Sequence, residues 1–274
     1  MNILVCIKQV PNVSEMRLDP QTGMLIRNGV STATNPFDLY ALEAAARMRD
    51  VYPEARIIVA SMGPPQAESS LRECLAIAAD SAYLISDAAF AGADTYATAY
   101  TLSLAVRYIE KATGRIDAIF CGKQAIDGDT AQVGPILAER LGLAQITSAL
   151  SIEADSEAIT ALQECGSYRR VLRAAYPCLV TFTKPQYDCR AATARRKLAS
   201  RRVEIGRIDS SMLPGFERGK TGLLGSPTQM KNTFSVAGRG GGRIVSGVSA
   251  EAAAEELYKA VAELGLVSAG EVAK

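Results

Sequence analysis

The sequence predicts an α/β fold with a doubly wound, mainly parallel sheet, a small antiparallel addition and a C-terminal arm. Apolar runs suited to buried strands alternate with helix-length segments through the first two thirds of the 274 residues. Such alternation is typical of a parallel sheet covered by helices on both faces. Hydrophobic residues make up 48% of the chain and charged residues 22%, so the chain can bury the core that such a sheet needs.

Five apolar runs are long enough for buried strands and too short for helices. They span residues 3–7, 56–60, 82–85, 118–121 and 178–183. The segments between and after them carry apolar residues at helical spacing or cap residues at their start. These predicted helices span residues 36–49, 65–78, 94–111, 131–143 and 250–264.

Three segments depart from this alternation. Residues 19–29 are typical of a hairpin, with Gly23 and Asn28-Gly29 as turn points. From residue 148 to 172 the pattern shifts to short alternating strands, for example 158–162 and 170–172, which predicts the antiparallel addition. Beyond residue 207 the chain is rich in loops and recovers a helical stripe only near its end. We therefore expect one domain at residues 1–206 and an arm at residues 207–274.

Composition excludes several classes of function. The chain has no histidine and its six cysteines form no CxxC pair, so a zinc site, a Ser-His-Asp triad and a Cys-His dyad are not expected. Its 30 basic and 29 acidic residues create no global field toward nucleic acid or membrane. No segment approaches the ~18 apolar residues of a membrane span, and the N-terminus does not resemble a signal peptide. We expect a cytoplasmic protein with buried thiols that holds a cofactor with its own chemistry.

The segment from Phe120 to Pro135, FCGKQAIDGDTAQVGP, is the strongest candidate for a ligand site. It joins a predicted strand to a predicted helix, and Asp127 to Thr130 supply turn residues and N-cap candidates. A helix N-terminus presents unpaired N–H groups to an anion. The same residues would also serve simply to turn the chain and cap the next helix, and the spacing leaves both interpretations open.

The predicted fold points to the same loop. Ligands of doubly wound sheets bind outside the carboxyl ends of the strands, where the strand order reverses. The loops that begin at Lys8, at Ser61 and at Gly122 are therefore expected to converge. No GxGxxG follows the first strand, so the standard dinucleotide fingerprint is absent. The basic stretch between residues 169 and 202 lacks an aromatic platform for nucleic acid, and it suits solvent or an acidic partner better.

Several segments, taken together and in order, resemble the beta subunit of electron transfer flavoproteins. They are KQVPNVSEMRLDPQTG (8–23), NPFDLYALEAA (35–45), SMGPPQAESSLRECLA (61–76), GADTYATA (92–99), GKQAIDGDTAQVGP (122–135) and GSPTQM (225–230). The resemblance implies a Rossmann-like, adenine-nucleotide-binding domain in a heterodimer with an alpha subunit that carries FAD. It also implies that the C-terminal arm packs on the alpha subunit.

The resemblance further implies which residues contact the nucleotide. They lie at the end of the first strand, at the start of the first helix, after the second strand and in the candidate loop. They are Cys6, Asn35, Pro36, Phe37, Asp38, Met62, Gly122, Lys123, Gln124, Ala125, Ile126, Asp127, Gly128, Asp129, Thr130, Ala131, Gln132 and Val133. No catalytic side chain and no metal ligand is implied.

Members of this family divide by the ligand of the beta subunit. In the housekeeping type the ligand is structural AMP, and electrons pass from acyl-CoA dehydrogenases to a membrane quinone reductase. In the bifurcating type it is a second FAD, which accepts hydride from NADH and sends one electron to ferredoxin or flavodoxin and the other to the alpha-subunit FAD. This chain is more similar to the second type in KQVP, EMRLDP, MGPP and DGDTAQVGP, where Gly128 and Thr130 would leave room for a flavin. The implied cofactor is therefore FAD, with AMP as the alternative.

One stretch departs from the family pattern. Housekeeping members carry a loop resembling LNEPRY that grips the dehydrogenase, whereas this chain has TKPQYDCRAATARRKLAS at residues 183–200. A flavin-dependent dehydrogenase other than an acyl-CoA dehydrogenase is the expected partner. The chain itself would be an electron-carrier subunit, and the heterodimer an NADH-dependent bifurcating oxidoreductase. A nucleotide-sensing protein of the universal-stress type is a further alternative, but such proteins are shorter and lack the arm.

Overall fold

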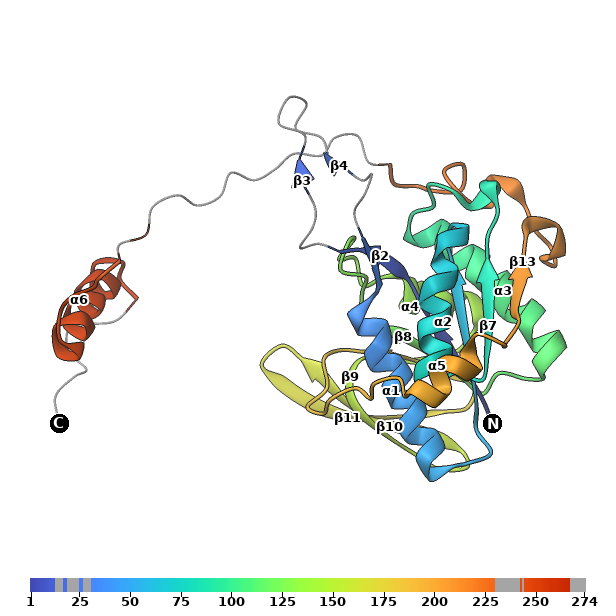
Figure 1. Ribbon diagram of the computed structural model, residues 1–274, viewed down its shortest axis with the longest axis horizontal. Coiled ribbons are helices and arrows are strands. Elements are labelled where there is room, and N and C mark those ends of the chain that lie inside the picture. The colour runs from blue at the N-terminus through green and yellow to red at the C-terminus, as the bar shows by residue number, and fades with distance from the viewer. Residues whose placement is uncertain (13–16, 19–24, 27–30, 230–241, 243, 267–274) are drawn as a thin grey trace. The chain divides into compact units, whose positions relative to one another are not determined.

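The structure is a computed structural model that describes residues 1–12, 17–18, 25–26, 31–229, 242 and 244–266 (Figure 1). The chain divides into two units, Met1–Thr233 and Phe234–Lys274, and each is described by itself. The first unit contains the sheet and the candidate loop. The second contains a single described helix.

A nine-stranded sheet organises the first unit, in the order β11-β10-β9-β12-β8-β1-β6-β7-β13. β9 Ala144–Ala154 pairs parallel to β12, and the six strands from β12 to β13 also run parallel to one another. Their bounds are β1 Asn2–Cys6, β6 Arg56–Met62, β7 Ser81–Ile85, β8 Ala118–Gly122, β12 Cys178–Phe182 and β13 Ile205–Ile208. The predicted α/β class and all five predicted parallel strands are confirmed, and β13 is an addition that the sequence did not predict.

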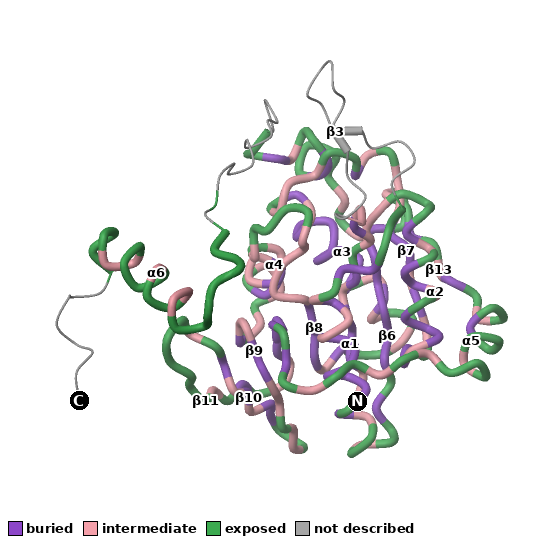
Figure 2. Tube along the Cα trace, turned by 60° about the vertical axis from the view of Figure 1, so that its left-hand side comes forward, coloured by how far each residue is buried: buried purple, intermediate pink, exposed green. Residues whose placement is uncertain are grey.

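Helices cover both faces of the parallel part of the sheet, which explains why its central strands β1, β6 and β8 are apolar almost throughout. The helices are α1 Pro36–Val51, α2 Glu68–Ile77, α3 Thr95–Thr113, α4 Val133–Leu141 and α5 Ala194–Ser200. One core cluster contains Ile3 and Val5 with residues of α1 and α2, and the other contains Leu4 with residues of α3 and α4. Alternate residues of β1 thus enter opposite cores, and Figure 2 shows the buried residues concentrated along the strands. A strand buried on both faces needs a continuous apolar run.

The helix boundaries follow the local signals in the sequence. A short 3-10 turn, Pro65–Ala67, precedes α2, so the prediction of a helix at 65–78 is confirmed with a tighter first turn. The Asp94 carboxylate accepts hydrogen bonds from the N–H groups of Tyr96 (2.9 Å) and Ala97 (3.0 Å) and caps α3. Gly142 ends α4 in the left-handed conformation, at φ 67°. Only α5 has no counterpart among the predicted helices, because its seven residues are too few for a periodic signal.

The predicted antiparallel addition is confirmed as a meander at one end of the sheet. It comprises β9 Ala144–Ala154, β10 Ala158–Cys165 and β11 Tyr168–Ala175. Two further pairs lie outside the main sheet. One is β2 Gln9–Pro11 with β5 Thr32–Thr34, and the other is β3 Arg17–Leu18 with β4 Leu25–Ile26. The second pair agrees with the predicted hairpin, whose turn points Gly23 and Asn28-Gly29 lie outside the described residues.

The first part of the predicted arm packs on the sheet domain. β13 pairs with β7, and Leu213 and Thr221 are buried. The Thr221 and Thr101 hydroxyls share a buried 2.8 Å hydrogen bond that joins this segment to α3. The Thr228 N–H and hydroxyl both donate to the Asp94 carboxylate. Residues 207–228 therefore belong to the same unit as the sheet.

The second unit is represented by α6, Ala250–Glu263. The Ser249 hydroxyl caps it by accepting a hydrogen bond from the Ala252 N–H (3.3 Å). None of its residues is buried, and Leu257 is 66% exposed. Among the helices that the structure describes, none is long and apolar enough to cross a membrane.

Candidate functional site

The candidate site lies where the strand order reverses. The chain leaves β1 through α1 and α2 toward β6 and β7, and then returns through α3 to β8 on the other side of β1. The carboxyl ends of β1 and β8 are therefore neighbours, and the loops that follow them begin at Ile7 and Lys123. This is the switch point at which doubly wound sheets bind their ligands.

A buried carboxylate joins the two loops. Asp38 is 6% exposed, and it accepts hydrogen bonds from Lys8 N–H (2.6 Å), the Asn35 side-chain amide (2.9 Å) and Gly122 N–H (3.2 Å). A Cβ on Gly122 would lie 2.3 Å from the Asp38 carboxylate, so only glycine permits this approach. Burial raises the pKa of Asp38 to about 7, and the three donors oppose that shift only in part.

Asn35 and Lys8 extend this connection to the candidate loop. The Asn35 side chain donates to the Gln124 carbonyl (2.8 Å) and accepts from Ile126 N–H (3.2 Å). The Lys8 ammonium lies 2.6 Å from the Asp127 carboxylate, which offsets one of the two acidic charges in the loop. Lys8 was not among the predicted contacts, although it follows the first strand and opens the KQVP segment.

The loop presents a run of free N–H donors. Asp129 and Ala131 have positive φ angles of 54°, and backbone that alternates in this way turns successive N–H groups into a concave nest. Within the described chain, the N–H groups from Thr130 to Gly134 donate to no acceptor. They lie at the N-terminus of α4, where Gln132 provides no side-chain cap. Nest and helix terminus together form a donor set suited to phosphate oxygens.

The predicted contacts separate into two groups. Asn35, Asp38 and Gly122 use their polar groups or their close packing to hold the loop in place. Residues 127–130 are exposed and available to a ligand, and a Cβ on Gly128 would meet no atom within 4 Å. The remaining members of the loop, all partly buried except the exposed Gln132, are Lys123, Gln124, Ala125, Ile126, Ala131, Gln132 and Val133.

The contacts predicted outside the loop lie at neighbouring element ends. Cys6 and Met62 are the last residues of β1 and β6, and both are half-buried. Pro36 is the exposed first residue of α1, and Phe37 packs edge to face on Tyr40, with ring centroids 5.8 Å apart. No hydrogen bond within the described residues links Met62 to the loop. Beside it, the buried hydroxyl of Ser61 has no partner in the described chain, and a polar ligand at this edge would provide one.

The residues present thus fit the phosphates of a nucleotide. Its phosphates match the N–H donors from Thr130 to Gly134, and Lys8 lowers the repulsion from Asp127. The exposed Asp129 carboxylate also contacts the Gln124 side chain. The loop therefore holds its acidic side chains in contact with Lys8 and Gln124, while the N–H groups from Thr130 to Gly134 stay free.

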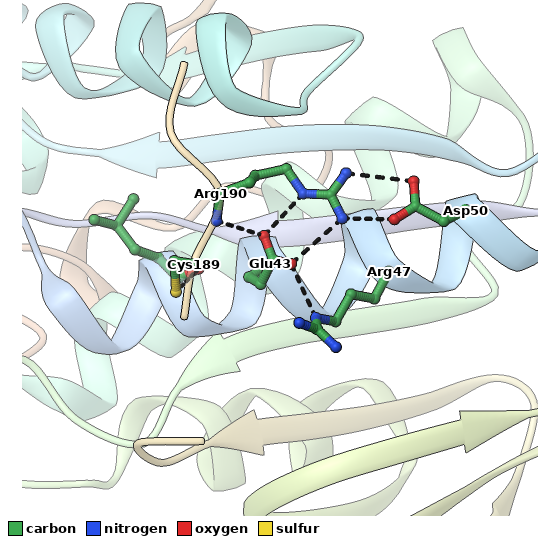
Figure 3. Close-up of polar contacts among 6 residues, drawn as sticks. Glu43, Arg47, Asp50, Cys189 and Arg190 are labelled. Carbon is green, nitrogen blue, oxygen red and sulfur yellow. Dashed lines mark hydrogen bonds and ion pairs between the residues drawn. The ribbon is translucent and has the colours of Figure 1, made fainter. Parts of the chain in front are cut away.

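The stretch at residues 183–200, which departs from the family pattern, is fixed to α1 by a second charged cluster (Figure 3). The Arg190 side chain lies 2.9 Å from the carboxylate of Glu43 and 2.7 Å from that of Asp50. Arg47 also contacts Glu43, at 3.0 Å, and stacks over the Tyr187 ring at 3.7 Å. Glu43 is only 3% exposed, so these arginines balance a buried charge. The hydrogen bond from Arg190 lowers the pKa of Asp50.

The end of the same stretch is fixed to α2. Arg196 donates to the carbonyls of Leu75 (3.2 Å) and Ala79 (3.0 Å) at the C-terminal end of α2. In return Arg72 donates to the carbonyls of Ser200 (2.8 Å) and Val203 after α5. Each arginine thus satisfies carbonyls at the other helix's end. The exposed face of α5, including Leu198 at 64% exposure, is held in one orientation.

Comparison with known proteins identifies the family to which this chain belongs. Residues 22–209 match a family model described as the electron transfer flavoprotein domain. This chain belongs to the electron transfer flavoprotein family. The resemblance to a beta subunit is confirmed by relatives that cover nearly the whole chain, and the universal-stress alternative is set aside.

Three relatives of this electron transfer flavoprotein chain illustrate the match. It is 42% identical to an electron transfer flavoprotein subunit beta from Megasphaera elsdenii, over 89% of this chain and 91% of the relative. It is 40% identical to the caffeyl-CoA reductase-Etf complex subunit CarD from Acetobacterium woodii, over 97% and 100%. It is 41% identical to protein FixA from Bradyrhizobium diazoefficiens, over 95% and 91%. The chain is therefore an electron transfer flavoprotein beta subunit.

Proposed function

We propose that this beta subunit binds FAD at the switch point and works, in a cytoplasmic heterodimer with an alpha subunit, as a bifurcating electron transfer flavoprotein. Electrons would enter from NADH and divide between ferredoxin or flavodoxin and the FAD of the alpha subunit. The electron that reaches the alpha-subunit FAD would continue to a flavin-dependent dehydrogenase. The name of the Acetobacterium relative supports this, because that protein is a subunit of a complex with a reductase.

The observation that carries the proposal is the open loop from Asp127 to Gly134. Its free N–H groups would hold the pyrophosphate of FAD, and the small, uncrowded Gly128 leaves space beside them. The network of Asp38, Asn35 and Lys8 would keep the loop in position. When bound, the flavin supplies the hydride and electron chemistry. The chain binds and orients it, and no side chain is assigned as a proton donor.

The alternative is the housekeeping function with structural AMP. The same N–H groups would serve a monophosphate equally well, and a relative named simply as a beta subunit matches at 42% identity. In this case the beta site would take no part in electron transfer. The stretch from residue 183 to 200 favours the bifurcating proposal, because it lacks the loop expected for an acyl-CoA dehydrogenase partner.

The alpha subunit would bind the C-terminal arm. The described helix α6 exposes Leu257 (66%), and Leu264 follows it at 72% exposure, so α6 carries apolar area that no described residue of its unit covers. Helices of this kind gain stability by burying such a face on a partner. Truncation after residue 233 should therefore abolish recovery of the alpha subunit with a tagged beta chain, while the sheet domain remains folded by circular dichroism.

Flavin content tests the main proposal. The chain is co-expressed with an alpha subunit of the same family, and the flavin and AMP of the purified heterodimer are counted. The bifurcating proposal predicts FAD on the beta subunit in addition to the alpha FAD, and bleaching of flavin absorbance by NADH. One FAD together with one AMP, and no response to NADH, would reject it in favour of the housekeeping function.

Two substitutions at one position test the location of the site. Gly128→Glu should lower nucleotide occupancy of the beta subunit without unfolding the protein, because the new carboxylate enters open space beside the N–H donors. Gly128→Ala is the matched control and should retain the ligand. Unchanged occupancy in Gly128→Glu would show that the ligand lies elsewhere.

A further inference from the structure

Two cysteines lie side by side under the candidate nucleotide site. β1 and β8 are parallel neighbours whose register pairs Val5 with Phe120, and Cys6 and Cys121 are the next residues along the two strands. Both side chains face the core beneath α3 and α4, where Cys121 is buried and Cys6 packs against the cluster. The pKa of the Cys121 thiol is raised well above its usual value, chiefly by its contact with the Cys6 thiol and secondly by its burial. The two thiols therefore interact.

The pair forms the floor of the site. A Cβ on Gly134 would lie 3.7 Å from the Cβ of Cys121, so Cys121 lies beneath the first turn of α4 and its free N–H groups. Cys6 is only half-buried, and two residues later Lys8 contacts Asp38 and Asp127. The two strands that carry the loops of the site therefore end at neighbouring thiols. Cys6 is one of the expected nucleotide contacts, but the chemistry of neither thiol enters the proposed function.

We propose that Cys6 and Cys121 form a reversible disulfide that closes the nucleotide site to its ligand. The more accessible Cys6 reacts first with a peroxide: its sulfur attacks the O–O bond, becomes a sulfenic acid and releases one water. The Cys121 sulfur then attacks that sulfur, the S–S bond forms, and the sulfenic hydroxyl leaves as water with the proton of Cys121. One hydrogen peroxide thus accepts the two electrons and two protons of the dithiol and becomes two waters.

The strand geometry explains why this bond would affect binding. Neighbouring strands are roughly 4.8 Å apart, which suits the Cα separation of a disulfide, but the bond needs Cβ atoms only about 3.8 Å apart. The strand ends must therefore approach each other. Gly122 N–H and Lys8 N–H both contact Asp38 from these ends, so the loop network would shift with them. A disulfide that strains the strand ends in this way is readily reduced, as a reversible switch requires.

Oxidation of the purified heterodimer tests the proposal, which rests on the proposed function only for the identity of the ligand. The protein is freed of nucleotide, reduced, treated with hydrogen peroxide and analysed by peptide mass spectrometry. A cross-link between the Cys6 and Cys121 peptides is expected, and dithiothreitol should remove it. In Cys121→Ala, Cys6 should instead continue to sulfinic acid. Cys74, which is fully buried, should stay unmodified in both proteins.

Nucleotide binding supplies the second measurement. AMP or FAD at ten times its Kd should slow cross-linking roughly tenfold, by mass action, and the cross-linked protein should bind neither. Oxidation of Cys6 without a cross-link would overturn the proposal, as would a cross-linked protein that binds AMP and FAD as tightly as the reduced one. Failure of the reduced protein to bind either nucleotide would instead refute the proposed function, and the cross-link is scored separately.

Discussion

Asp38→Asn provides the sharpest test of how the candidate site is built. In the folded protein burial raises the pKa of Asp38 from 3.8 to about 7. Between about pH 4 and pH 7 the folded state therefore holds one proton more than the unfolded state. The free energy of unfolding must then fall as the pH rises through this window, and level off above the folded pKa. Asparagine carries no titrating proton, so the variant should lack this fall.

The size of the effect follows from the same pKa values. A difference of about three units corresponds to roughly 4 kcal/mol. We expect the wild type to lose about that much stability relative to Asp38→Asn between pH 4 and pH 7.5. Urea unfolding followed by circular dichroism, at half-unit steps of pH, measures the difference. Asp127→Asn, which removes an exposed carboxylate from the same network, is the control: it retains Asp38, so its stability should fall over the same pH range as that of the wild type.

The opposite sign would refute the reasoning. Asp38 accepts three hydrogen bonds, from Lys8, Asn35 and Gly122, and such donors favour the charged form. If they outweighed burial, the wild type would gain stability over Asp38→Asn as the pH rises from 4. A difference independent of pH would show that Asp38 titrates alike in the folded and unfolded states.

Three further substitutions, one of them with Gly128→Ala as its control, test the packing at this site and at two other places in the fold. Gly122→Ala should destabilise the protein by roughly 3 kcal/mol in urea unfolding, because the new Cβ meets a buried carboxylate and backbone. Gly128→Ala, the control, should change the stability by less than ~0.5 kcal/mol. Equal effects of the two substitutions would contradict the geometry. Gly222→Ala should also cost roughly 3 kcal/mol, since φ is 57° and the Cβ would lie 2.3 Å from a carbonyl oxygen, and an unchanged Tm would exclude that contact. Arg190→Ala should lower the stability by about 2 kcal/mol, because it leaves the buried Glu43 with fewer partners. Amide hydrogen exchange should also become faster across residues 187–193. Protection at the wild-type level would show that Arg190 does not fix this stretch.

The arrangement of the core was accessible from the sequence. Strands such as β1 and β6 are buried on both faces, so their sequences must be apolar without interruption, and the helices between them carry local caps such as Asp94 and Gly142. These signals are local, because burial and capping act on consecutive residues. Short elements without a period, such as α5 and β13, gave no such signal.

The candidate loop was also found from local sequence, since Gly122 and the DGDT segment mark a turn before a helix. The hydrogen bonds that hold this loop in place were not found from the sequence. The family resemblance names Asp38 as a nucleotide contact, whereas in the structure its carboxylate is buried and occupied by three donors. Residue type alone cannot reveal this, because an aspartate at a helix start serves equally as a cap, a ligand contact or a buried acceptor.

The sequence by itself determined the α/β class, the order of the elements and the loop most suited to a phosphate. Only the tertiary structure decided which polar groups are consumed in holding that loop and which stay free for a ligand. Lys8 meets Asp127 across 119 positions of the chain, and Arg190 meets Glu43 across 147. Such pairs depend on strand order and helix placement, and a buried charge is tolerated only where the fold brings it a partner. The neighbouring thiols of Cys6 and Cys121 arise in the same way, from the register of two strands that are distant in sequence.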